Sequence, residues 1–137
     1  MKISTKGRYA LRMMVDIAQQ GRERPVALRE IAQRQGISVK YLEQIAAVLT
    51  RAGYLKSVRG AQGGYILTRE PKEYTAGEIL RLTEGNLAPV ECLEAEKNLC
   101  PRAEHCTTLR LWEELNQVVR QVVDGRTLED LADEKRM

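Results

Sequence analysis

Apolar residues recur every three or four positions in the first third of the chain, which is the pattern of amphipathic helices. The first such stretch runs from Thr5 to Gln20, and Gly21 ends it. A short second stretch begins at Leu28. The buried stripe of a third helix is expected on Leu42, Ile45, Ala46 and Leu49.

The residues between the second and third stretches predict how these helices are joined. Gly36 has the backbone freedom for a tight turn, and the Ser38 hydroxyl is placed to cap the third helix. Two helices joined in this way form a helix-turn-helix, whose second helix lies in the DNA major groove; an ordinary helical hairpin is the alternative. The exposed residues of that helix are types that bind phosphates and bases, namely Lys40, Tyr41, Glu43, Gln44 and Arg51.

A β-hairpin is predicted directly after this helix. Residues 54–67 give a strand, a glycine-rich turn and a second strand. Alone, such a hairpin has no special meaning, but after a recognition helix it is interpreted as a wing. Lys56 and Arg59 suit phosphates or a narrow minor groove, and Gly60 with its neighbouring glycines allows close backbone approach.

The second half of the chain is predicted to be helical. Thr75 and Glu78 form a capping-box pattern that opens a helix ending at Gly85. Residues 107–123 carry a wide apolar surface, and a last short helix starts at Thr127. The wide surface either folds back on the first helix or forms a dimer, and dimerisation is favoured. The predicted fold is mainly α with a small β-hairpin: a winged helix-turn-helix plus a long C-terminal dimerisation helix.

Charge is distributed unevenly along the 137 residues. Residues 1–68 carry 12 Lys/Arg and 4 Asp/Glu, whereas residues 69–137 carry 10 and 15. A basic half next to an acidic half favours a polyanion as partner, although a solvated basic face is the alternative. No apolar run has the roughly 20 residues of a membrane span, and the N-terminus lacks a signal-peptide core. We therefore expect a cytoplasmic protein without a membrane partner.

All the cysteines and the only histidine lie between residues 92 and 106. Their spacing is C-x7-C-x5-C, which lacks the closely paired ligands of structural zinc sites. Clustered thiolates suit a soft metal or an iron–sulfur cluster, and the odd number argues against a disulfide framework. A thiol redox switch, a zinc site and plain structural cysteines remain as alternatives.

Three separated motifs identify a family. Residues 1–10 (MKISTKGRYA), 41–45 (YLEQI) and 59–65 (RGAQGGY) resemble the iron–sulfur cluster regulators of the IscR, NsrR and CymR type, and the resemblance covers nearly the whole chain. It implies a homodimeric winged-helix repressor on a palindromic operator in double-stranded DNA, and no enzyme. It places DNA contacts on Ser38, Lys40, Tyr41, Glu43, Gln44 and Arg59, with the wing glycines such as Gly60 around them.

The same resemblance implies that Cys92, Cys100 and Cys106 hold an iron–sulfur cluster, with a 2Fe-2S cluster favoured over 4Fe-4S. The fourth ligand departs from the family pattern, because Leu109 stands where many members have histidine. The candidates for the fourth ligand on this chain are His105, Glu94 and Glu104. A residue of the partner subunit or an exogenous molecule are the remaining alternatives. Loss or oxidation of the cluster is expected to change operator affinity.

Two other functions remain open. A CymR-like regulator of cysteine metabolism would be controlled by a partner protein such as cysteine synthase, or by thiol oxidation. A small iron–sulfur redox protein is the alternative from another class, but no nucleotide-binding loop or second cysteine set supports it. In domain terms we expect a winged helix-turn-helix in 1–85, a cysteine-rich sensor loop in 86–106, and dimerisation and terminal helices in 107–137.

Overall fold

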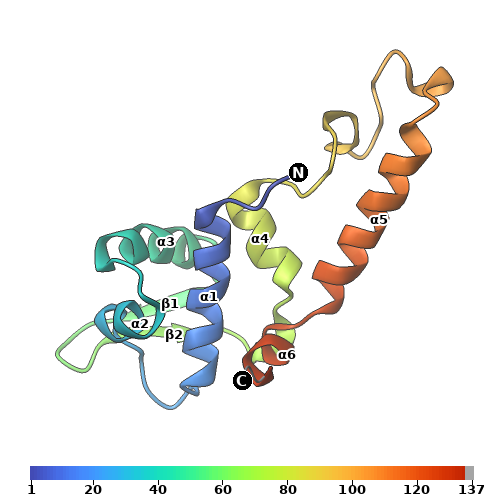
Figure 1. Ribbon diagram of the computed structural model, residues 1–137. Helices are drawn as coiled ribbons and strands as arrows, with labels where there is room; N and C mark the ends of the chain where they lie inside the picture. Colours follow the sequence, from blue (N-terminus) through green and yellow to red (C-terminus); the bar gives the residue numbers. More distant parts are fainter. Residues whose placement is uncertain (135–137) are drawn as a thin grey trace.

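The computed structural model describes residues 1–134, and within them the predicted class, mainly α with a small β-hairpin, is confirmed (Figure 1). The helices are α1 (Thr5–Gln19), α2 (Leu28–Gln35), α3 (Val39–Arg51), α4 (Ala76–Glu84), α5 (Leu109–Gly125) and α6 (Leu128–Asp133). The strands are β1 (Leu55–Val58) and β2 (Gly64–Leu67), and short 3-10 turns cover Pro71–Glu73, Glu91–Leu93 and Ala103–His105.

Helix α1 is the central element of the body. The Ser4 hydroxyl accepts the backbone N–H of Gly7 at 3.1 Å and so caps its N-terminus. Its apolar face is fully buried, and α2, α3, α4, α6 and β2 all pack around it. The members of this face are Ala10, Met13, Met14 and Ile17. The elements of the helix-turn-helix and the base of the hairpin are therefore fixed relative to α1.

The predicted helix-turn-helix is present. Gly36 adopts the left-handed conformation, with φ 65° and ψ 36°, and ends α2. Ile37 enters the core, and the Ser38 hydroxyl accepts the backbone N–H of Tyr41 at 3.1 Å, as expected of an N-cap. Local sequence signals thus determine both the turn and the start of α3.

The hairpin is tied to the body at its base. Its strands pair antiparallel from Leu55–Leu67 to Val58–Gly64. The buried Tyr74 hydroxyl donates to the Tyr54 carbonyl at 2.8 Å and accepts the N–H of Thr68 at 3.0 Å. On the other side, Val26 and Tyr65 exchange two backbone hydrogen bonds of 2.9 Å. These bonds leave only the tip of the hairpin to project from the body.

The last two helices take different positions (Figure 1). Capping boxes at Thr75 and Thr127 open α4 and α6, as predicted for the first and consistent with the predicted start of the second. Leu128 is fully buried, and α6 packs on α1. Helix α5 packs instead against α4 and stands away from the rest of the body. The interpretation in which the long helix folds back on the first helix therefore does not hold.

No helix within residues 1–134 combines the length and the apolar content that crossing a membrane requires. Helix α5 is the longest of them, and charged residues interrupt it throughout. Its apolar side chains are confined to part of its circumference.

Candidate nucleic-acid interface and sensor segment

The N-terminal half of α3 presents polar side chains to solvent. Lys40, Glu43 and Gln44 are exposed, and among the described residues none of the three forms a side-chain hydrogen bond or ion pair. Tyr41 is half-buried, because its ring packs edge-to-face on Tyr9 of α1 with centroids 5.6 Å apart. This surface has free donors and acceptors of the kind that contact base edges and phosphates.

The wing adds cationic side chains on a tight turn. Lys56 and Arg59 are exposed, and neither has a carboxylate partner within residues 1–134. Gly60 has φ 110°, and its carbonyl accepts the N–H of Gly63 at 3.0 Å, which closes the turn. A Cβ on Gly64 would collide with the main chain of Val26, so this glycine is required where the hairpin meets the body. The wing glycines were predicted to allow close approach of the backbone to DNA, and the contact of Gly64 with Val26 was not predicted.

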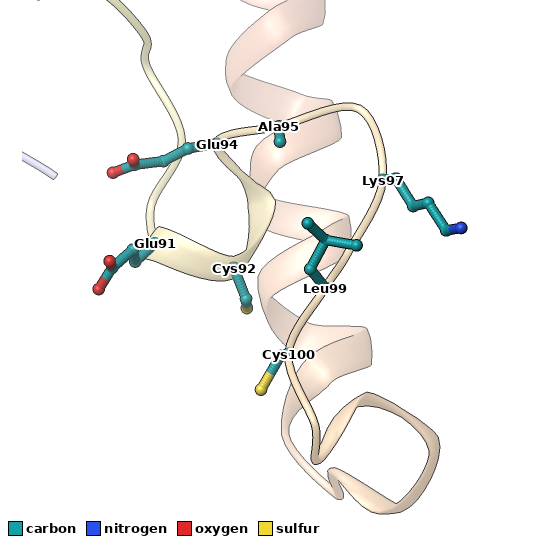
Figure 2. A pocket seen from close by; sticks show the side chains of 7 residues that line it. All are labelled: Glu91, Cys92, Glu94, Ala95, Lys97, Leu99 and Cys100. Carbon is teal, nitrogen blue, oxygen red and sulfur yellow. The ribbon is translucent and has the colours of Figure 1, made fainter.

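The cysteines lie on the segment between α4 and α5, which reaches the end of α5 that is far from the body (Figure 1). Cys92 and Cys100 are half-buried and line a common depression, the loop pocket (Figure 2). The loop pocket is lined by Glu91, Cys92, Glu94, Ala95, Lys97, Leu99 and Cys100. Cys106 and His105 are exposed and lie outside this lining, as does Glu104.

As a donor set, these residues suit an iron–sulfur cluster. All three thiols are free, and thiolates are the ligands such clusters use. Their arrangement in the described residues is open: no group of three or more His, Cys, Asp or Glu side chains there converges on a metal-sized site. The chemistry of the donors therefore fits, and the segment has to draw Cys106 toward the loop pocket to use all three.

The surroundings of Cys106 favour its thiolate form. The Thr108 hydroxyl, 3.5 Å from Sγ, lowers the pKa of the Cys106 thiol, and the backbone N–H groups of Thr108 and Leu109 act in the same direction. The thiolate is the reactive and metal-binding form. Cys106 is also exposed, whereas Cys92 and Cys100 are half-buried, so we expect Cys106 to react first when no metal is bound.

Replacing Thr108 tests this pKa shift. In metal-free protein that lacks Cys92 and Cys100, Thr108→Val is expected to raise the pKa of Cys106, because the hydroxyl that stabilises the thiolate is gone. The measurement is the rate of alkylation by iodoacetamide against pH, whose midpoint should move upward. Thr107→Val is the matched control and should leave the midpoint in place; an equal effect of both substitutions would contradict the assignment to Thr108.

Helix α5 carries an uncovered apolar stripe. Leu111, Leu115, Val118 and Val122 follow one another at spacings of four, three and four residues and are between 37% and 57% exposed. Such spacing places them on one face, as in helices that pair side by side. Near its C-terminus, α5 is fastened to α4 by the Arg81–Asp124 ion pair, with oxygen–nitrogen distances of 2.6 and 3.0 Å.

The body and hairpin together define a winged-helix DNA-binding regulator of transcription. The family model described as an iron-dependent transcriptional regulator, Rrf2, matches residues 3–134. The chain belongs to the Rrf2 family, which confirms the predicted kinship with regulators of the IscR and CymR type. The relatives are named as transcriptional regulators, so the prediction that the chain is not an enzyme is also confirmed.

Individual relatives agree with this assignment. The chain is 46% identical over 132 residues to the transcriptional regulator CymR of Bacillus subtilis strain 168, covering 96% of this chain and 90% of the relative. The solved structure of B. subtilis CymR, called the global cysteine regulator, superposes with a TM-score of 0.83 at 45% identity and 99% coverage of both chains. The structure of T. potens IscR gives 0.76 at 41% identity, covering 100% of this chain and 94% of that one.

Proposed function

We propose that the chain is a homodimeric repressor that reads a palindromic operator with two α3 helices and two wings. Ser38, Lys40, Tyr41, Glu43 and Gln44 would contact the major groove, and the wing residues Lys56, Arg59 and Gly60 the adjacent backbone or minor groove. The observation that supports this most directly is the free, exposed polar surface at the start of α3 beside an unpaired cationic wing, both within residues 1–134.

The dimer would form through the uncovered stripe of α5. An exposed row of large apolar side chains on a helix that stands clear of its own body needs a partner, and a second copy supplies an identical stripe. In this proposal 1–85 binds DNA, 86–106 senses, and 107–137 contains the dimerisation helix α5 and the short helix α6, which packs on α1 of its own body. Residues 135–137 of this last segment lie outside the described residues. A duplex-binding regulator of this kind would work in the cytoplasm.

We further propose that Cys92, Cys100 and Cys106 hold an iron–sulfur cluster, with two iron atoms favoured over four. The observation that carries this is three free thiols on one segment before the N-terminus of α5, in a family described as iron-dependent. His105 is the proposed fourth ligand. Glu94, which lines the loop pocket, is an alternative on the chain. A bound cluster supplies a redox-active group that oxidants or iron shortage can remove.

The chain's own residues would convert that event into a change in DNA affinity. Drawing the three cysteines together orders the segment between α4 and α5, while the Arg81–Asp124 pair holds the other end of α5 on α4. The angle of α5 to the body then determines how far apart the two α3 helices lie in the dimer. The coupling must favour one dimer geometry by about 1 kcal/mol or more, roughly fivefold in affinity, to matter.

Anaerobic purification followed by iron and sulfide analysis tests the sensor. Wild type is expected to contain both elements and to absorb visible light, whereas Cys92→Ala, Cys100→Ala and Cys106→Ala should each lose them, because three thiolates are the minimum donor set on the segment. His105→Ala should weaken retention of the cluster if the imidazole is a ligand.

DNA affinity is measured with the duplex that wild type enriches from a random pool. Equal affinity with and without the cluster would refute sensing.

A second candidate is favoured by one observation: the similarity to CymR extends over almost the whole of both chains. In this alternative a partner protein such as cysteine synthase, or oxidation of a thiol, controls DNA affinity. Iron-free wild-type protein would then bind the duplex enriched from the random pool with undiminished affinity, and added cysteine synthase would change that affinity. The iron-dependent proposal predicts no such effect of the enzyme.

A further inference from the structure

One carboxylate lies where apolar residues are expected. Asp16 belongs to α1, between Met13 and Ile17, and it is the one charged residue of 1–134 that is buried, at 1% exposure. Its two oxygens accept hydrogen bonds from Arg34, with Nη2 at 2.7 Å and Nε at 3.0 Å. Gln35 adds a third bond from its side-chain amide at 2.9 Å. Burial of a charge is tolerated only with such complete pairing.

A second residue of α1 holds the same end of α2. Arg12, one helical turn before Asp16, donates to the side-chain oxygen of Gln35 at 3.1 Å and also to its main-chain carbonyl. The last two residues of α2 are therefore bonded to two successive turns of α1. The residue that follows them is Gly36, the turn of the helix-turn-helix.

We propose that Asp16 is a positioning residue for DNA recognition. By fixing Arg34 and Gln35, it sets the direction in which the chain enters the turn and hence the orientation of α3 against α1. Apolar packing between α1 and α2 alone would tolerate sliding, whereas directional bonds to a buried carboxylate select one arrangement. The inference rests on the proposed role of α3 as the helix that reads bases.

A positioning role differs measurably from a role in stability alone. Hydrogen bonds to base edges have strict geometry, so a small rotation of α3 removes them. Long, flexible Lys and Arg side chains can still reach the phosphates after such a rotation, so these contacts persist. A misplaced α3 should therefore lose discrimination between sequences and keep its general affinity for DNA, whereas partial unfolding lowers both affinities in proportion.

The test measures affinity for two duplexes, the one that wild type enriches from a random pool and a scrambled duplex of the same length. Asp16→Asn removes the charge that pairs with Arg34, and Gln35→Ala removes the third bond and the side-chain bond from Arg12 while keeping the ion pair. For both variants we expect the ratio of the two affinities to fall about tenfold, comparable to one mismatched base pair. Affinity for the scrambled duplex should stay within about twofold, because its phosphate contacts persist.

Arg22→Gln is the matched control, since it removes an ion pair of 2.7 Å with Glu70 that is exposed and does not involve Asp16; its ratio should equal that of wild type. An unchanged ratio in folded Asp16→Asn, or a parallel fall for both duplexes, overturns the inference. If Asp16→Asn does not fold, Gln35→Ala decides in the same way. Lys40→Ala separates the underlying proposal: if it alters neither affinity, the assignment of α3 as the reading helix fails.

Discussion

Leu115→Asp is expected to convert the proposed dimer into monomers and to weaken binding to a two-fold symmetric duplex by about 100-fold, the usual gain from linking two binding units. Leu115 lies in the middle of the uncovered stripe of α5 and is 37% exposed in the single chain. A second copy on this stripe would bury the new carboxylate without a cation, which costs several kcal/mol. Sedimentation equilibrium gives the mass, and fluorescence anisotropy gives the affinity.

Gln117→Asp is the matched control, because it adds the same charge to the same helix. Two residues further along, its side chain points nearly opposite to that of Leu115, and Gln117 is exposed. This variant should remain a dimer with wild-type affinity. A dimeric Leu115→Asp would mean that another face joins the protomers, and monomers in both variants would mean that charge alone opposes association.

The starts of the helices were predictable because their signals are local. The hydroxyl groups of Ser38, Thr75 and Thr127 each accept the backbone N–H of the residue three positions later. These bonds cap the helices and do not depend on the rest of the chain. The same locality explains the left-handed Gly36. The predicted start of the long helix at residue 107 was early by two residues, since α5 begins at Leu109.

Contacts between residues that are far apart in the chain could not be predicted from the sequence. Nothing near Asp16 in the chain indicates that Arg34 pairs with it, although an acidic residue on an apolar helix face was a signal that a partner exists. The pairing of Val26 with the wing likewise depends on where α2 is packed. The apolar surface of α5 was visible in the pattern, but a pattern cannot say which surface covers it.

The cysteine segment illustrates the same division. Composition and spacing give the donors, and the structure brings Cys92 and Cys100 to one pocket. The location of Cys106 outside that pocket could not be predicted, because the intervening loop has no periodicity and no pattern of caps that fixes its path. The lowered pKa of Cys106 depends on Thr108, which follows it by only two residues, so this feature is local in the sequence.

Arg59→Ala is expected to weaken binding to the selected and the scrambled duplex alike, and to reduce the salt dependence of both. Arg59 is exposed at the wing tip, next to Gly60 and without a carboxylate partner within residues 1–134. Removing one cation from a phosphate makes the negative slope of log affinity against log salt less steep by about 0.9. The proposed dimer has two wings, so its plot should become less steep by about two.

Arg110→Ala controls for the loss of one positive charge, because Arg110 is exposed on α5 and its pairing with Glu114 is local. Its slope should match that of wild type. If Arg59→Ala instead keeps the slope for scrambled DNA and loses discrimination at one base pair of the selected duplex, Arg59 reads a base and does not neutralise a phosphate. If neither quantity changes, the wing tip lies off the DNA, and α3 alone must account for recognition.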